Sequence, residues 1–165
     1  MNRAFPSIHF NAEDLGYMSQ EVKDLLAASN WPGMNILMFA FDPREDGEEK
    51  PEEFIENSVC YTGTHDNTTL LGWLESLPDE ILNSLKAYFN SEDPKVLAEK
   101  IIQEGERSKS FLMVVPIQDW LGMGKEARIN TPGTSSGNWQ WRLRSMDLLK
   151  SLAPRIKKTI GDRAQ

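Results

Sequence analysis

Cysteine and histidine are scarce in this sequence: 165 residues include one cysteine, Cys60, and two histidines, His9 and His65. A single cysteine forms no internal disulfide and excludes thiolate-rich metal sites. No short His-x-x-x-His spacing predicts a zinc site. No apolar run approaches the roughly 20 residues that cross a bilayer, and the N-terminus lacks the apolar stretch of a secretory signal. We therefore expect a cytoplasmic protein without a metal site or a membrane partner.

Basic residues are outnumbered. Eighteen Lys and Arg face 25 Asp and Glu, giving a formal net charge of −7. An acidic chain is a poor candidate for sequence-independent binding of nucleic acid, because phosphates must be neutralised by Lys and Arg. Seven Phe and five Trp supply material for a core and argue against disorder. The length predicts a single domain over residues 1–165.

Short apolar runs alternate with amphipathic segments along the chain. The runs at 8–10, 36–41, 58–61 and 111–117 predict four strands. Helices are predicted after Ser19, after residues 67–68, from Pro78, from Pro94 and around residues 148–152. An acidic loop over residues 44–56 separates the second and third strands.

This alternation predicts an α/β protein with parallel strands buried between helices. A doubly wound sheet and a (β/α)8 TIM barrel both fit the pattern. A complete barrel typically needs about 250 residues, so four βα units would form half of one. Half a barrel has two unclosed edges, and we expect it to be a piece of something larger or to pair with a copy of itself.

Polar side chains follow each predicted strand, where parallel-strand proteins place their sites. They are carboxylates, amides and one imidazole: Glu13, Asp14, Asp42, His65, Asp66, Asn67, Gln118 and Asp119. Convergent carboxylates suit general acid/base chemistry on sugars, and they also suit hard cations. Polar turns and helix caps explain the same residues equally well. Three tryptophans fit either stacking on sugar rings or core packing, namely Trp120, Trp139 and Trp141.

Four ordered motifs carry a resemblance. They are Asn-Ala-Glu-Asp-Leu-Gly at 11–16, the Pro-Gly-Met-Asn-Ile-Leu-Met-Phe-Ala-Phe string at 32–41, Tyr-Thr-Gly-Thr-His-Asp-Asn-Thr at 61–68, and Pro-Ile-Gln-Asp at 116–119 with its following loop through 127–134 and 137–139. The sequence resembles the C-terminal portion of amylomaltase-type 4-α-glucanotransferases, glycoside hydrolase family 77. That resemblance implies the C-terminal half of a TIM barrel. It also implies retaining transfer of α-1,4-glucan segments between maltooligosaccharides derived from starch or glycogen, without a cofactor.

The resemblance also implies roles for individual residues. Glu13 matches the general acid/base, and Asp66 matches the carboxylate that stabilises the oxocarbenium-like state. Gln118 would form a wall of the site. Substrate contacts are implied at five further positions: His65, Asn67, Phe41, Asp42 and Asn130.

One departure from the family pattern bears directly on activity. The family's nucleophilic Asp precedes the acid/base, and the twelve residues before Glu13 contain no equivalent. We therefore expect this chain to be a partial catalytic domain, without the N-terminal half of the barrel, and to be inactive alone. Its partners would be that missing half or a second copy of itself. Two minor departures are Thr68, in place of an Asp, and Asn11, in place of an apolar residue.

Three alternatives stay open. A His-Asp pair after a late barrel strand also occurs in α-amylase-type hydrolases. The lack of a nucleophile fits a non-catalytic glucan-binding fragment. The unpaired strand edges fit a half-barrel that associates with itself.

Overall fold

Three short parallel strands form the sheet. The computed structural model describes residues 4, 7–16, 18–45 and 49–163. In them, β1 (Gly33–Ile36) pairs with β2 (Ser58–Tyr61), which pairs with β3 (Leu112–Val114). The register places Met34 beside Val59, and Val59 beside Leu112. The predicted α/β class and the parallel direction are confirmed, whereas three of the four expected strands are present in the described part of the chain.

The strand predicted at residues 8–10 is wrong. This segment is extended, but it forms no ladder within the described chain. The main-chain N–H of Ala12 donates to the carbonyl of Pro32 over 2.9 Å, just before β1 begins. One such bond aligns the segment with the sheet edge without making it a strand.

The strand predicted over residues 36–41 is also wrong in its extent. Ile36 ends β1, and the next four residues form the short helix α2 (Leu37–Ala40). The carbonyl of Leu37 accepts from the N–H of Phe41 at 3.0 Å. An unbroken apolar run is equally compatible with a buried strand and a buried helical turn, so periodicity alone does not separate the two.

Five helices lie near their predicted positions: α1 (Gln20–Ser29), α3 (Leu70–Ser76), α4 (Asp79–Phe89), α5 (Pro94–Arg107) and α7 (Asp147–Arg163). The short helix α6 (Ile117–Trp120) is not predicted, and it begins at the last residue of the run expected to be a strand, of which only Leu112–Val114 pairs. There are 3-10 turns at Pro51–Glu53 and Lys125–Ala127. Pro94 occupies the first turn of α5, where its missing N–H costs nothing. Asn30 and Asn90 end α1 and α4 in the left-handed conformation.

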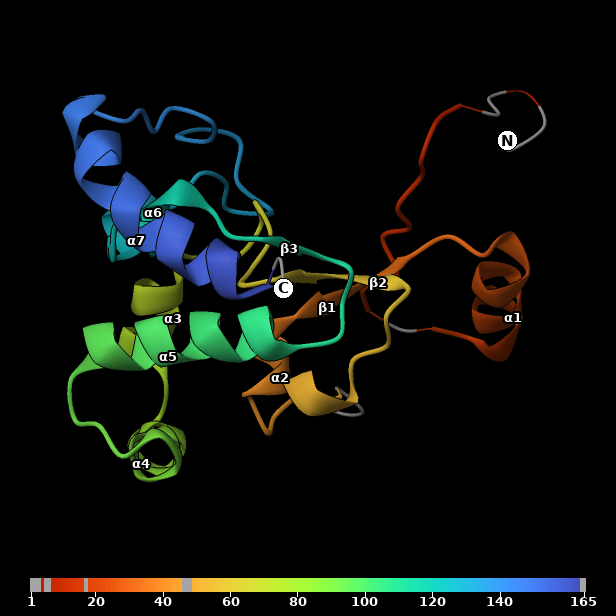
Figure 1. Cartoon of the computed structure of the whole chain (residues 1–165), viewed down its shortest axis with the longest axis horizontal. Helices are drawn as coiled ribbons and strands as arrows, with labels where there is room; N and C mark the ends of the chain where they lie inside the picture. The colour runs from red at the N-terminus through yellow and green to blue at the C-terminus, as the bar shows by residue number, and fades with distance from the viewer. Residues whose placement is uncertain (1–3, 5–6, 17, 46–48, 164–165) are drawn as a thin grey trace.

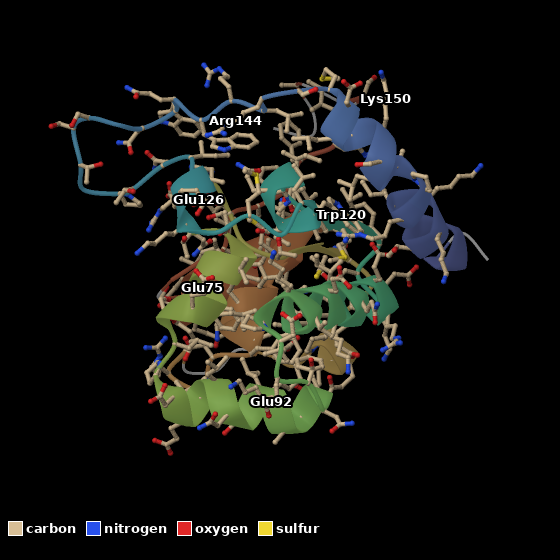
Figure 2. All side chains as sticks on the ribbon, turned by 90° about the vertical axis from the view of Figure 1, so that its left-hand side faces the viewer. Glu75, Glu92, Trp120, Glu126, Arg144 and Lys150 are labelled. Atoms are coloured by element: carbon tan, nitrogen blue, oxygen red, sulfur yellow. The ribbon has the colours of Figure 1, made fainter. Side chains whose placement is uncertain are left out.

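The core lies between the sheet and helices α3 and α5. Its fully buried members include Leu37, Leu70, Leu74, Leu97 and Ile101. Figure 1 shows α3, α4 and α5 together on one side of the molecule, with α7 above them. Figure 2, turned by 90°, shows α4, α5 and α7 stacked from bottom to top. This layer holds the carboxyl ends of β2 and β3 in place.

Helix α1 lies apart from the other helices, on the far side of the sheet (Figure 1). None of its residues is buried, and the apolar face predicted for it is open: Val22 is 45% exposed and Leu25 69%. In the described part of the chain, no helix is both long and apolar enough to cross a membrane.

Candidate active site

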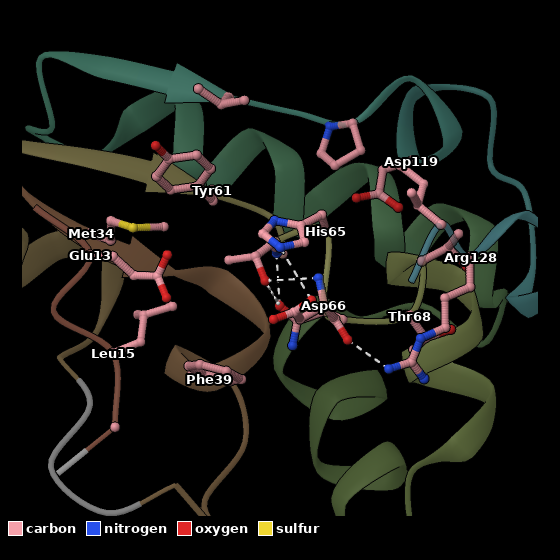
Figure 3. A pocket seen from close by; sticks show the side chains of 18 of the residues that line it. Glu13, Leu15, Met34, Phe39, Tyr61, His65, Asp66, Thr68, Asp119 and Arg128 are labelled. Atoms are coloured by element: carbon pink, nitrogen blue, oxygen red, sulfur yellow. Dashed lines mark hydrogen bonds and ion pairs between the residues drawn. The ribbon is translucent and has the colours of Figure 1, made fainter. Parts of the chain in front are cut away.

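A cavity of about 1170 Å³ opens at the carboxyl ends of the three strands. Seven of the eight strand-end residues singled out in the sequence line it: Glu13, Asp14, His65, Asp66, Asn67, Gln118 and Asp119. Figure 3 shows Glu13 on one side of this cavity, with His65 and Asp66 facing it from the other. The parallel strands therefore bring together residues that lie more than 50 positions apart in the sequence.

Asp66 is held by partners from two different segments of the chain. Its Oδ1 accepts a hydrogen bond from Asn130 Nδ2 at 2.6 Å and lies 3.2 Å from Nε2 of His65. The Asp66 side chain is 49% exposed and lines the cavity. Charge-assisted bonds to one carboxylate oxygen fix the group's orientation and leave the other oxygen available for a ligand hydroxyl.

Arg128 fixes the main chain around Asp66. Its guanidinium donates to the carbonyl of Asp66 at 2.6 Å (Figure 3) and to the carbonyl of Asn130 at 2.7 Å. Arg128 thus ties the turn after β2 to the loop after α6. Arg is suited to such a link because its planar group presents several donors in fixed geometry.

Glu13 stands in an exposed segment that Asp14 anchors. The carboxylate of Asp14 accepts from the N–H of Met34 at 2.8 Å, at the beginning of β1. Gly33 makes room for this contact, since a Cβ there would lie 2.3 Å from Asp14 Oδ2. Asp14 is therefore a structural residue, and its neighbour Glu13 is left free to face the cavity.

Other strand-end residues build the turns of the site. Asn67 Oδ1 accepts from the N–H and the hydroxyl of Thr64, at 2.7 and 2.9 Å. Gln118 is buried and donates to the carbonyl of Ala127 at 3.3 Å. Because Asn67 closes this turn, the cap of α3 passes from the predicted residues 67–68 to Thr69, whose hydroxyl accepts from the N–H of Gly72.

Asp119 is buried where α6 meets α3, and it is 4% exposed. Its carboxylate accepts from the hydroxyl of Thr62 at 2.5 Å and from the N–H of Leu70 at 2.7 Å. Burial raises the pKa of Asp119 above its usual value, and the two hydrogen bonds oppose that rise. The bond to Leu70 satisfies a main-chain donor in the first turn of α3, so Asp119 organises the wall of the cavity.

Phe41 and Asp42, which were expected to contact substrate, are not among the residues that line the cavity. The chain turns into α2 after Ile36 and carries both residues toward the core. Phe41 packs against Phe89 with ring centroids 5.4 Å apart. Asp42 is paired with Arg44 at 2.6 Å, and this hydrogen bond holds the pKa of Asp42 below its usual value. Asn130 likewise is not among the lining residues, and it reaches the site through Asp66.

Sequence reasoning missed Arg128 and Tyr61. Both line the cavity. Burial raises the pKa of Tyr61, and its hydroxyl accepts from Asn11 Nδ2 at 3.0 Å. The amide of Asn11, which stands in place of an apolar residue of the family pattern, is therefore paired. Tyr61 could have been found as the last residue of a strand, whereas nothing in the spacing around Arg128 marks its reach to Asp66.

The described residues contain no group of three or more His, Cys, Asp or Glu side chains arranged to hold a metal ion. The cavity instead combines open carboxylates, an imidazole, an arginine and aromatic surface. Carboxylates and amides bind sugar hydroxyls, and a pair of carboxylates can act as acid/base and charge stabiliser in glycoside chemistry.

Comparison with known proteins identifies the family. The model of the 4-α-glucanotransferase family matches residues 1–148. The chain belongs to this family. A 4-α-glucanotransferase of Streptococcus pneumoniae is 40% identical over 133 residues, which cover 80% of this chain and 26% of that protein. The chloroplastic/amyloplastic 4-α-glucanotransferase of Solanum tuberosum is 35% identical over 94% of this chain and 27% of its own length.

Solved structures agree with the sequence comparison. The amylomaltase from Streptococcus agalactiae, solved in complex with acarbose, superposes with a TM-score of 0.87 and 30% identity. The match covers 99% of this chain and 33% of that one. Amylomaltase from Corynebacterium glutamicum shares the fold with a TM-score of 0.66 at 21% identity. The chain thus spans about a quarter to a third of the length of the family members it matches.

Proposed function

We propose that this chain supplies two of the three catalytic carboxylates of a retaining 4-α-glucanotransferase. The substrate is an α-1,4-glucan, such as a maltooligosaccharide, and no cofactor takes part. The observation that carries the proposal is the position of Glu13, His65 and Asp66 around one cavity, in a chain of this family. We further propose that the three strands are an arc of a (β/α)8 barrel and that the protein works in the cytoplasm.

Glu13 is the general acid/base in this proposal. It protonates the leaving glycosidic oxygen when the donor bond breaks, and it later takes the proton from the attacking acceptor hydroxyl. Its exposed position on the cavity wall supports that role, since the group must meet two different glucan chains in turn. Asp14, fixed on Met34, keeps the segment in place while Glu13 works.

Asp66 stabilises positive charge on the sugar ring. A carboxylate whose orientation is fixed before reaction lowers the barrier without reorganising during it. The bond from Asn130 fixes the carboxylate itself, and the bond from Arg128 fixes the main chain of Asp66. His65, 3.2 Å from Asp66, is positioned to hold a hydroxyl of the same sugar.

We also propose that the 165-residue chain does not transfer glucan by itself. Retaining transfer needs a nucleophile roughly 5–5.5 Å from the acid/base. Of the other carboxylates on the cavity wall, Asp14 and Asp119 are bound to main-chain N–H groups, and Glu45 lies in the exposed segment after α2. Transfer would then require a nucleophile supplied by the remaining part of a barrel.

Two measurements test this proposal together. Incubation with maltotriose should give no glucose and no maltopentaose, and calorimetric titration with maltoheptaose should show binding that Asp66→Ala weakens. Longer oligosaccharides in the incubation would contradict the lack of a nucleophile. Binding without any effect of Asp66→Ala or Glu13→Gln would contradict the assigned site. An excess of reducing ends would instead favour an α-amylase-type hydrolase.

A further inference from the structure

Trp139 is exposed at the edge of the cavity, and the proposed reaction gives it no role. Of the three tryptophans that the sequence singled out for stacking, Trp120 is buried beneath the guanidinium of Arg155 and belongs to the core. Trp139 is instead 57% exposed, although tryptophan is usually well covered. Its ring centroid lies 5.3 Å from that of His65, a lining residue of the cavity.

The backbone holds Trp139 in a conformation that a bulky residue seldom adopts. Its φ is +62°, in the left-handed region. The N–H of Trp139 donates to the carbonyl of Ile129 at 2.7 Å, and its own carbonyl accepts from Arg142 at 2.8 Å. Strain of this kind persists where surrounding contacts impose it, and it gathers at ligand sites.

The loop that carries Trp139 is closed on itself. The side chain of Asn138 accepts from the N–H of Thr131 at 2.9 Å, and its amide donates to the carbonyl and hydroxyl of Thr134, at 3.2 and 3.0 Å. This loop runs along the top of Figure 2, toward Arg144. The two ends of this loop contact two neighbouring residues of the cavity: Asn130 hydrogen-bonds to Asp66, and the ring of Trp139 packs against His65.

We propose that Trp139 is a stacking platform for one glucose unit of an α-glucan that extends out of the cavity past His65. An aromatic face binds the apolar face of a pyranose, and a neighbouring carboxylate binds its hydroxyls. Here the ring of Trp139, the imidazole of His65 and the carboxylate of Asp66 form one continuous exposed surface. This inference rests on the proposed glucan-binding function and adds a subsite outside the catalytic cavity.

Calorimetric titration of the 165-residue chain with maltose and with maltoheptaose tests the platform. Trp139→Asn removes the ring, and Asn tolerates positive φ better than other residues do. The substitution should weaken maltoheptaose binding about tenfold and leave maltose binding unchanged. Trp139→Phe, which keeps an aromatic face, should stay within about threefold of the wild type. Phe111→Ala is the matched control, since Phe111 is 56% exposed at the opposite end of β3.

Two results overturn the platform in distinguishable ways. If Trp139→Asn binds maltoheptaose as tightly as the wild type, the platform is wrong and the proposed function stands. If the wild type binds neither sugar, glucan binding by this chain is wrong as well. If Trp139→Asn fails to fold, the indole N–H resonance of Trp139 in the wild type provides the test, and Trp139→Phe serves to assign that resonance. A shift of this resonance with maltoheptaose but not with maltose supports the platform. No shift with maltoheptaose overturns it.

Discussion

Asn130 Nδ2 lies 2.6 Å from Asp66 Oδ1, so a loop 64 residues further along the chain holds the carboxylate that faces the cavity. Arg128 makes a second link from the same loop, to the main-chain carbonyl of Asp66. The loop after α6 is therefore part of the site through Asp66 itself. The geometry of Asp66 depends on both segments.

Removing the amide of Asn130 should weaken glucan binding. A hydrogen bond to a charged group at an exposed site contributes about 1 kcal/mol, so Asn130→Ala should lower maltoheptaose affinity about fivefold. The melting temperature should change little, because the bond is exposed. Asn57→Ala is the matched control: Asn57 is exposed just before β2, at the other end of the sheet. Unchanged affinity in Asn130→Ala would show that Asp66 keeps its orientation without this bond.

Replacing Asp119 with asparagine should cost less stability than replacing it with alanine. Asp119→Asn keeps an oxygen for the N–H of Leu70, and the hydroxyl of Thr62 can rotate to accept instead of donate. Asp119→Ala leaves the buried N–H of Leu70 unpaired and should reduce the free energy of unfolding by about 2–3 kcal/mol. Urea unfolding measures both variants. Equal losses in the two variants would contradict the assigned role of Asp119 on α3.

The pH dependence of stability should separate Asp119 from its amide variant. The pKa of Asp119 is raised in the folded protein, so its contribution is fully present below the unfolded value and is lost as pH rises through the folded value. Asp119→Asn removes this loss. Its free energy of unfolding should therefore improve relative to the wild type as the pH rises above about 4. A difference that stays constant across this range would contradict the raised pKa.

The contribution of Asp42 to stability should depend on pH in the opposite direction. Its pKa is lowered, chiefly by the hydrogen bond from Arg44, so its contribution is present above the unfolded value and is lost as pH falls through the folded value. Arg44→Ala should destabilise the protein slightly at neutral pH, since Arg44 is 55% exposed, and by less in acid. Urea unfolding near pH 7 and near pH 3 measures the difference. An equal loss at both pH values would show that the ion pair is not responsible.

Two helical glycines should respond in opposite ways to alanine. A Cβ on Gly105 of α5 would lie 2.5 Å from Met113 Cε and 2.7 Å from Leu37 Cδ1. Overpacking of this kind costs about 1–3 kcal/mol and should exceed the gain in helix propensity. Gly161 of α7 has no atom within 4 Å of a built Cβ, so Gly161→Ala should stabilise by up to about 1 kcal/mol. Thermal unfolding compares the two, and stabilisation by Gly105→Ala would contradict the tight packing of α5.

Sequence reasoning predicts the fold well where the local signal is strong. Pro94 begins α5 and the run at 58–61 forms β2, both as predicted. In each case the local pattern favours one kind of secondary structure, a helix start at Pro94 and a buried strand at 58–61. The run at 36–41 fits both a strand and a buried turn, and tertiary contacts decide for α2. Residues 8–10 have the composition of a strand but make no ladder in the described chain.

The same distinction applies to the site. His65 and Asp66 follow a clear strand, so their place at the cavity is predictable. Phe41 and Asp42 were expected at a strand end that the structure moves to Ile36. The links from Asn130 and Arg128 to Asp66 depend on the path of a long loop, and no periodic pattern in the sequence encodes that path.

The most direct test of the account is a nuclear magnetic resonance titration of the 165-residue chain with maltoheptaose. If the cavity is a glucan site, the largest amide shifts should fall at Glu13, at the turn through His65 and Asp66, and at Arg128. The amides around Phe41 and Asp42, which lie off the cavity, should not respond. No shifts, or shifts centred away from Glu13 and Asp66, would contradict the claim that this chain contributes those two carboxylates to glucan transfer.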